Sequence, residues 1–134
     1  MFNSDLVIDY LIMGENTLKE MESHEDFFAK LFLFLRAMQS AIDTSFILIV
    51  NLNLKKPKNY FEIFTILREG RIISIKTEEE MLIFAALRSK LIFNTNESEL
   101  SETLSLLSDF KKTFLNFISE VRQFINNMEL INIL

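Results

Sequence analysis

The stretch from His24 to Leu52 constrains the fold most, because apolar side chains recur there every three or four residues without a break. Phe32 and Phe46 extend an apolar area that is made of two adjacent rows. The rows are Phe28, Leu31, Leu35, Met38, Ile42, Ser45 and Ile49, and beside them Phe27, Phe34, Ala41 and Leu48. Such a pattern is typical of a helix that is apolar around most of its circumference. We therefore expect a long helix that is central in its bundle, shared with a partner subunit, or both.

The residues before this stretch predict a first helix that begins after Asn3 or Ser4. Its apolar positions are Val7, Leu11, Leu18 and Met21. Gly14 fills the remaining position of that stripe, where it costs about 1 kcal/mol relative to alanine unless a neighbouring helix passes closely. Ser23 is the expected cap of the following helix, with Asp26 three residues later as its capping partner.

Pro57 interrupts the helical pattern, since the residue before a proline avoids the helical conformation. Residues 60–68 then predict a short helix that ends at Gly70. Thr77 and Glu80 form a capping box, which predicts the start of a fourth helix. The inward positions expected for these two helices are Tyr60, Phe61, Phe64 and Leu67, and then Met81, Phe84, Ala85, Leu87 and Leu91.

Asn96 and Glu99 are the expected cap of a last helix, and the apolar tail 130–134 has no assignment beyond docking on the body or on a partner. The inward positions of this helix are Leu100, Leu104, Leu107, Phe110, Phe114, Phe117, Val121, Phe124 and Met128. The chain has only two glycines and one proline, too few for the many turns of a sheet protein. The sequence predicts an all-α fold, a four- to five-helix up-and-down bundle that forms one domain over residues 1–134.

The charge of the chain is unevenly distributed. A net charge of −5 argues against a general grip on nucleic acid, yet residues 55–90 carry eight basic and five acidic side chains, a local excess of three positive charges. A basic patch is one interpretation of this excess, and chance clustering on a solvated surface is the other. The candidate patch residues are Lys55, Lys56, Lys58, Arg68, Arg71 and Lys90.

Targeting and redox features are few. The first residues lack the basic and long apolar regions of a signal peptide. The densest apolar run, from Phe46 to Val50, is far shorter than the roughly 20 residues that a membrane span needs. The absence of cysteine excludes a disulfide framework and a thiolate metal site. We expect a cytoplasmic protein that does not enter a membrane.

His24 is the only histidine, so imidazole acid–base catalysis within one chain depends on it. It lies in the acidic run 22–26, and a solvated surface residue is the simpler interpretation. The sequence has no glycine-rich phosphate loop, no di-iron spacing and no Ser-His-Asp arrangement. We therefore predict neither a metal ion nor a cofactor.

Three segments between residues 36 and 95 carry a more specific signal. They are Arg36-Ala37-Met38-Gln39-Ser40-Ala41-Ile42-Asp43, then Pro57 and Asn59-Tyr60-Phe61-Glu62-Ile63-Phe64 with Leu67 and Gly70, and finally Leu87-Arg88-Ser89-Lys90-Leu91-Ile92-Phe93-Asn94-Thr95. In this order they resemble the glutamine-isoleucine-aspartate segment, the proline-tyrosine-phenylalanine segment and the ribonuclease signature of HepT-like proteins of the HEPN superfamily. The resemblance covers about residues 30–125 and implies a helical bundle of the HEPN type.

The resemblance also implies a metal-independent ribonuclease whose arginine and histidine lie in a cleft between two protomers. Arg88 matches the arginine, but Ser89 replaces an asparagine, Phe93 the histidine, and Thr95 a tyrosine that accepts AMP from a partner nucleotidyltransferase. Asn94 completes the segment that would line the cleft. Phenylalanine cannot transfer a proton, and the loss of a general acid–base group lowers the rate by about 10²–10⁴-fold. An arginine alone can still hold a phosphate.

Asp43 lies on the most apolar helix, and the resemblance places it opposite Arg88. A buried aspartate needs a cation or several hydrogen-bond donors, so a structural Asp43–Arg88 pair is the alternative to an active site. Removing one member of a buried pair costs about 3–5 kcal/mol.

Three functions fit the sequence. The first is a catalytically degraded HepT-like protein that forms a homodimer and binds a small nucleotidyltransferase or RNA in a toxin–antitoxin-like system. The second is an active ribonuclease that uses Arg88 with Asn94, Thr95 or His24 in place of the missing histidine. The third is a structural or adaptor bundle in which the basic segment has no role.

Overall fold

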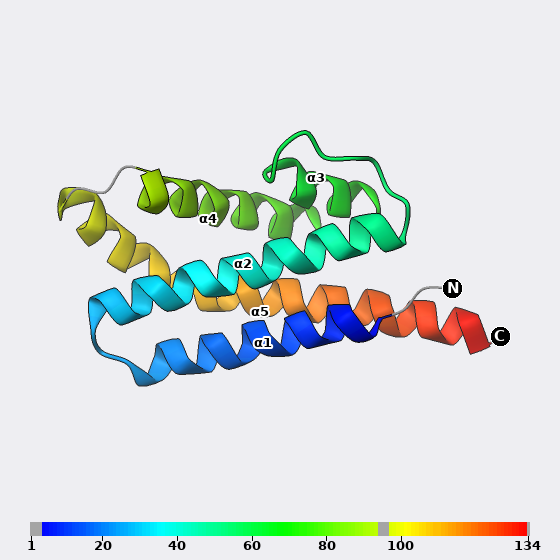
Figure 1. Cartoon of the computed structure of the whole chain (residues 1–134), viewed down its shortest axis with the longest axis horizontal. Coiled ribbons are helices and arrows are strands. Elements are labelled where there is room, and N and C mark those ends of the chain that lie inside the picture. Colours follow the sequence, from blue (N-terminus) through cyan, green and yellow to red (C-terminus); the bar gives the residue numbers. More distant parts are fainter. Residues whose placement is uncertain (1–3, 94–96, 134) are drawn as a thin grey trace.

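The computed structural model describes the backbone of residues 4–93 and 97–133 and the side chains of 4–93 and 105–131. This part of the chain folds into five helices and contains no strand. The helices are α1 (Asp5–Ser23), α2 (Phe27–Asn51), α3 (Glu62–Glu69), α4 (Ile75–Phe93) and α5 (Glu97–Ile133). In Figure 1, α1 and α2 form an antiparallel hairpin, α4 and α5 run back and forth beside it, and α3 lies near the carboxyl end of α2. The predicted all-α bundle is confirmed.

The central position predicted for α2 is confirmed, because it contacts α1, α3 and α4 and supplies buried residues from both predicted rows. Met38, Phe34 and Leu48 are fully buried. Phe28 departs from the prediction, since 69% of it is exposed although its row was expected to face inward. Three-four spacing winds slowly around a helix, and Phe28 lies where the row has turned away from the core. Phe32 is exposed on the same side.

α2 is long and apolar enough to cross a membrane if length and composition are considered alone, with a mean hydropathy of 1.5 over 18 residues. The prediction from the sequence rested on unbroken apolar runs, so it did not recognise that α2 as a whole is this apolar. In the bundle, 61% of that window is buried by other parts of the chain. The hydropathy of α2 is therefore explained by its place in the core.

The helix starts differ from the predicted caps. Asp26 caps α2, because its Oδ2 accepts a hydrogen bond from the Ala29 amide at 3.0 Å, whereas Ser23 ends α1 and donates to the Glu20 carbonyl. The predicted Ser23 cap is therefore wrong. The predicted capping box at Thr77 is also wrong, because α4 begins at Ile75 and Thr77 lies inside its first turn. Ser74 caps α4 instead, since its Oγ accepts from the Thr77 amide at 3.2 Å.

The end of α3 also departs from the prediction. Gly70 closes the helix with an ordinary φ of −77°, and the left-handed conformation falls on Arg71 with a φ of 60°. Two hydrogen bonds enforce this turn: the Arg71 amide donates to the Arg68 carbonyl, and the Ile72 amide donates to the Leu67 carbonyl, both at 2.9 Å. Glycine is the usual residue at the position that Arg71 occupies.

Gly14 is where three helices meet, as its place in the apolar stripe predicts. A Cβ added there would lie 2.8 Å from Phe114 Cζ of α5 and 2.8 Å from Ser40 Oγ of α2. The phenylalanines of α5 continue this contact into the core, where Phe110 packs edge-on against Phe34 at 4.7 Å between ring centroids. The close approach at Gly14 explains why a glycine stands in the middle of α1.

The tail that had no assignment continues α5 as far as Ile133. Its apolar residues Leu130 and Ile131 are 59% and 64% exposed, so they do not dock on the bundle. The predicted cap residue Asn96 and the side chains of Leu100 and Leu104 lie outside the part of the chain that is described.

Candidate functional site

Arg88 joins α4 to α2 through a side-chain amide. Its Nη2 donates to Gln39 Oε1 at 2.9 Å, and Gln39 Nε2 donates in turn to Asp43 Oδ1 at 2.9 Å. Gln39 and Asp43 are one turn apart on α2, so one helix face carries both groups. The predicted direct Asp43–Arg88 pair is therefore replaced by a bridged one. The amide uses its acceptor for the guanidinium and its donor for the carboxylate, which links the two charged groups without direct contact.

Tyr60, in the connection between α2 and α3, supports the same guanidinium. The Arg88 Cζ lies 5.3 Å from the centroid of the Tyr60 ring, a cation–π distance. The Tyr60 hydroxyl donates to the Ala85 carbonyl on α4 at 3.3 Å, which ties the ring to the helix that carries Arg88. We call Gln39, Asp43, Tyr60 and Arg88 the Arg88 cluster. It brings together one residue or more from each of the three segments that carry the family resemblance.

The Arg88 cluster is half-buried and its hydrogen bonding is incomplete. Arg88 and Asp43 are both partly exposed, and Gln39 is exposed. Arg88 Nε is buried, and the described residues offer it no hydrogen-bond partner. The guanidinium therefore lies at the boundary between the α2–α4 interface and solvent, with one donor that the described part of the protein leaves unpaired. This geometry suits recognition of an anion, because an arginine presents several donors in one plane.

The remaining residues of the predicted signature do not gather around Arg88. Phe93 is the last residue of α4 and is 82% exposed. Five residues along a helix correspond to a rotation of about 140°, so Phe93 and Arg88 point to different sides of α4. Ser89 is partly exposed beside Arg88, and Asn94 and Thr95 lie outside the described residues.

His24 does not take the place of the missing histidine within the chain. It is exposed and follows the last residue of α1, before α2 begins. Phe27, the first residue of α2, precedes Gln39 by twelve residues, which corresponds to about 18 Å along the helix axis. The imidazole is therefore remote from the Arg88 cluster of its own chain.

The six candidate patch residues belong to three segments of the chain. Lys55, Lys56 and Lys58 lie in the connection that follows α2, and they are exposed. Arg68 forms an ion pair with Glu78 at 3.0 Å, and Arg71 lies just after α3. Lys90 is twelve residues beyond Glu78 on α4, about 18 Å along the axis. Arg68 and Lys90 therefore do not belong to one compact patch.

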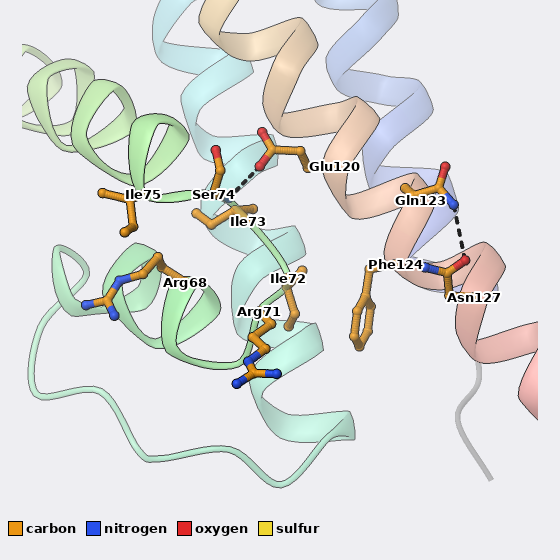
Figure 2. A pocket seen from close by; sticks show the side chains of 10 residues that line it. All are labelled: Arg68, Arg71, Ile72, Ile73, Ser74, Ile75, Glu120, Gln123, Phe124 and Asn127. Carbon is orange, nitrogen blue, oxygen red and sulfur yellow. Dashed lines mark hydrogen bonds between the residues drawn. The ribbon is translucent and has the colours of Figure 1, made fainter.

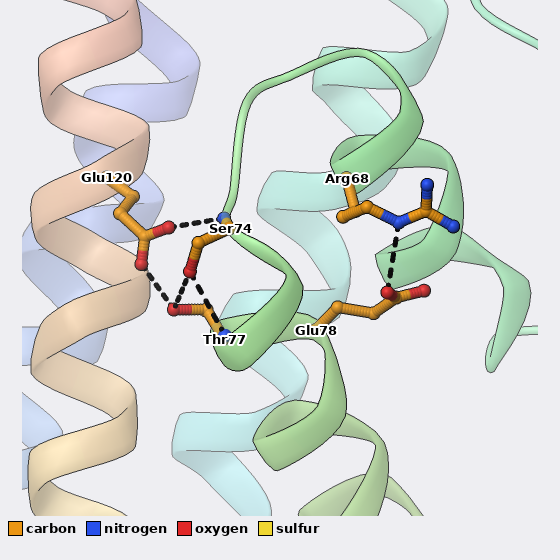
Figure 3. A network of polar contacts seen from close by, with 5 residues as sticks. All are labelled: Arg68, Ser74, Thr77, Glu78 and Glu120. Atoms are coloured by element: carbon orange, nitrogen blue, oxygen red, sulfur yellow. Dashed lines mark hydrogen bonds and ion pairs between the residues drawn. The ribbon is translucent and has the colours of Figure 1, made fainter.

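A second polar group, which the sequence reasoning missed, ties the start of α4 to α5. Glu120 of α5 accepts hydrogen bonds from the Ser74 amide and from the Thr77 hydroxyl (Figure 3). The Ser74 hydroxyl also donates to Thr77 Oγ1 at 3.1 Å. A serine just before a helix is a signal for a helix cap, but nothing in the sequence connects that cap with Glu120. A carboxylate at this place is stabilised by the positive end of the α4 dipole.

The described residues hold no group of three histidine, cysteine, aspartate or glutamate side chains arranged for a metal ion. The Arg88 cluster consequently offers one cation, one carboxylate bridged by an amide, and a tyrosine ring. These contacts connect α2 with α4, and the guanidinium is the group of the cluster whose chemistry suits an anion.

The sequence and the fold of this chain were compared with those of known proteins. No curated protein matches the sequence. Among solved structures, the tri-AMPylated HEPN toxin of Shewanella oneidensis in complex with the MNT antitoxin is 16% identical, with a TM-score of 0.80 over 89% of this chain and 98% of that one. YutE from Bacillus subtilis, a cytosolic protein of unknown function, is 18% identical, with a TM-score of 0.78 over 95% of this chain and 93% of that one.

A mutant form of the MntA–HpeT toxin–antitoxin, in which a tyrosine is replaced by alanine, is 16% identical and has a TM-score of 0.78 over 89% of this chain and 99% of that one. These three solved structures share the helical fold of this chain, and a comparison of the sequence with protein families points to the same family. The family model described as ribonuclease HepT-like matches residues 5–121, which include every residue of the Arg88 cluster. This chain therefore belongs to the HepT-like ribonuclease family of the HEPN superfamily.

Proposed function

We propose that this chain is a HepT-like protein that has lost ribonuclease activity and acts as a dimeric binding component with a nucleotidyltransferase partner. The observation that carries the proposal is Phe93, which stands at the position of the family's histidine and is exposed, away from Arg88. A phenyl ring can neither accept nor donate a proton. The Arg88 cluster retains its arginine, so anion binding survives the loss of catalysis.

The exposed face of α2 supports a homodimer. Phe28, Phe32, Phe46 and Val50 share this face at a spacing of whole turns, and they are 69%, 64%, 39% and 75% exposed. Gln39 lies between them on the same face and belongs to the Arg88 cluster. Large apolar side chains exposed along one helix face mark an interaction site, because their exposure to water is unfavourable. A second copy packed on this face brings two Arg88 clusters close to the interface.

Light scattering coupled to size exclusion tests the dimer. The wild type is expected to have the mass of two chains at micromolar concentration, and Phe32→Asp is expected to be a monomer. Ile131→Asp is the matched control, since Ile131 is also 64% exposed but lies near the end of α5. A monomeric wild type, or equal dissociation by both substitutions, would contradict the proposed interface.

The partner is inferred from the structural relatives. The S. oneidensis toxin is bound to the MNT antitoxin, and the MntA–HpeT structure is a toxin–antitoxin pair. In this chain Thr95 stands at the position of the modified tyrosine, so we propose that the nucleotidyltransferase binds without adding AMP there. Co-expression with a small nucleotidyltransferase of the MNT class is expected to yield a complex in which this chain keeps its unmodified mass. A partner that fails to co-purify would remove this part of the proposal.

Two further points belong to the same proposal. RNA is the expected ligand of the Arg88 cluster, because its phosphates are the anions that an arginine on a half-open surface would meet. A cytoplasmic location fits this role, and the B. subtilis relative is described as cytosolic. Arg88→Ala is expected to weaken RNA binding, whereas Lys19→Ala, which removes an exposed lysine of α1, leaves it unchanged. Equal weakening by both substitutions would point to general charge attraction instead of a site at Arg88.

A further inference from the structure

A pocket of about 480 Å³ lies between the α3–α4 connection and α5, away from the Arg88 cluster. Figure 2 shows Arg71, Ile72 and Phe124 pointing into the same opening. Ile75, the first residue of α4, also lines this pocket, and Arg88 lies thirteen residues further along the helix, about 20 Å away. The volume is within the range of small-molecule sites.

Arg71 is held in a conformation that an arginine rarely adopts. Its φ of 60° is left-handed, although the neighbouring Gly70 would adopt it without a steric penalty and has a φ of −77°. At the end of α2 the left-handed position is taken by Asn53, which tolerates it. None of the four ion pairs in the described part of the chain includes Arg71. The described ion pairs therefore give no reason for an arginine at this position, and backbone strain of this kind is often found at binding sites.

Arg71 also carries a positive charge that no acidic residue lining this pocket pairs with. Arg68 is paired with Glu78, and Glu120 is hydrogen-bonded by Ser74 and Thr77 (Figure 3). The amino end of α4 further offsets the Glu120 carboxylate. An anion that enters the pocket consequently meets one free guanidinium.

The wall opposite Arg71 suits a flat, polar-edged ring. The Phe124 ring is half-buried and faces the opening. Beside it, Gln123 Nε2 donates to Asn127 Oδ1 at 3.1 Å. This hydrogen bond does not use the carbonyl oxygen of Gln123 or the amide nitrogen of Asn127, so an acceptor and a donor remain on this pair. A nucleobase edge presents a donor and an acceptor side by side, and its face stacks on aromatic side chains.

We propose that this pocket binds a nucleotide, with the phosphate on Arg71, the base against Phe124 and the base edge on the free amide groups of Gln123 and Asn127. The site is separate from the Arg88 cluster and does not depend on the proposed function. The nucleotide has two sources, a free mononucleotide or a residue of single-stranded RNA. Both present the same phosphate and base.

The test is a titration of the full chain with AMP and with a short single-stranded oligoadenylate, followed by calorimetry and by the amide resonances of residues 70–75 and 120–127. At least one of the two ligands is expected to bind the wild type and to shift these resonances. Arg71→Gly is expected to weaken that binding by about tenfold or more, because a charge-assisted hydrogen bond is lost. Phe124→Leu is expected to weaken it as well, through the loss of stacking.

Two controls make the result decisive. Lys19→Ala, which removes an exposed lysine of α1, should leave AMP binding unchanged, and the resonances that shift separate this site from the Arg88 cluster. Arg71→Gly should raise the thermal midpoint of unfolding, because glycine adopts a left-handed φ without strain, so its loss of binding is not a folding defect. AMP binding alone identifies a free nucleotide, and oligoadenylate binding alone identifies RNA. No binding of either, binding that survives Arg71→Gly, or Arg71-dependent binding of a polyglutamate peptide in place of both, overturns the proposal.

Discussion

Among individual residues, the Arg88 cluster shows how a signature arginine is held once its histidine is absent. Gln39 accepts from Arg88 and donates to Asp43, and the Tyr60 ring lies against the guanidinium. Each contact is modest by itself, since a hydrogen bond contributes about 0.5–1.5 kcal/mol and an exposed cation–π contact about 0.5–1 kcal/mol. Together they fix the orientation of a half-buried side chain whose Nε has no partner in the described residues.

We expect Gln39 and Arg88 to be energetically coupled. Arg88→Ala is expected to lower the free energy of unfolding by about 1–2 kcal/mol, through the lost hydrogen bond and the lost ring contact. Urea denaturation of Gln39→Ala, Arg88→Ala and the double variant measures the coupling, which should be about 0.5–1.5 kcal/mol. Arg36→Ala is the matched control, because Arg36 is an exposed arginine on α2. Strict additivity of the two substitutions would show that the Gln39–Arg88 contact is not maintained in solution.

The start of α2 provides a second test, which asks whether Asp26 or Ser23 is its cap. Asp26 caps α2, whereas Ser23 hydrogen-bonds the end of α1. Asp26→Ala is expected to lower the free energy of unfolding by about 1 kcal/mol, since the Ala29 amide loses its partner. Ser23→Ala, measured in the same urea series, should change it by less than about 0.5 kcal/mol. The opposite ranking would restore Ser23 as the cap.

The packing of α1 depends on Gly14, because any Cβ there meets Phe114 and Ser40 at 2.8 Å. Gly14→Ala gains about 1 kcal/mol of helix propensity, but overpacking in a dense core costs about 1–3 kcal/mol. We expect a net loss of stability in thermal unfolding. Asn16→Ala, at an exposed position of the same helix, should leave stability equal or slightly higher. A stabilised Gly14→Ala would mean that α1 moves away from α5 at little cost.

Apolar periodicity predicted the elements well but their ends poorly. The spacing of Val7, Leu11 and Leu18 reflects helix geometry alone, so α1 could be predicted without knowledge of its neighbours. A cap depends on where one amide points, and several serines, threonines and aspartates near each boundary offer the same chemistry. At the end of α3 the left-handed residue was expected to be Gly70, but it is Arg71. The hydrogen bonds that close the helix decide this, and the sequence pattern does not show them. Such choices are made by contacts that a local pattern does not contain.

Across the bundle, the sequence predicted which residues belong to the candidate site but not how their side chains contact one another. The resemblance placed Arg88 opposite Asp43, and the two side chains are connected through Gln39, yet spacing alone could not show that an amide bridges them. The charge excess over residues 55–90 suggested one patch, but Arg68 is paired with Glu78 and Lys90 lies twelve residues beyond that pair on α4. Glu120 reaches the start of α4 only because α5 packs beside it. Contacts between distant segments follow from the packing of helices, which the sequence pattern does not specify.

RNA cleavage by the purified protein decides whether catalysis has been lost, with the wild type, Arg88→Ala and Phe93→His assayed side by side on single-stranded RNA. We expect the wild type and Arg88→Ala to leave the RNA intact, because Phe93 cannot transfer a proton. If only Phe93→His cleaves the RNA, the rest of the catalytic cleft is preserved and the missing histidine alone explains the lost activity. Cleavage by the wild type that Arg88→Ala abolishes would refute the proposed loss of activity, since another group must then have replaced the histidine.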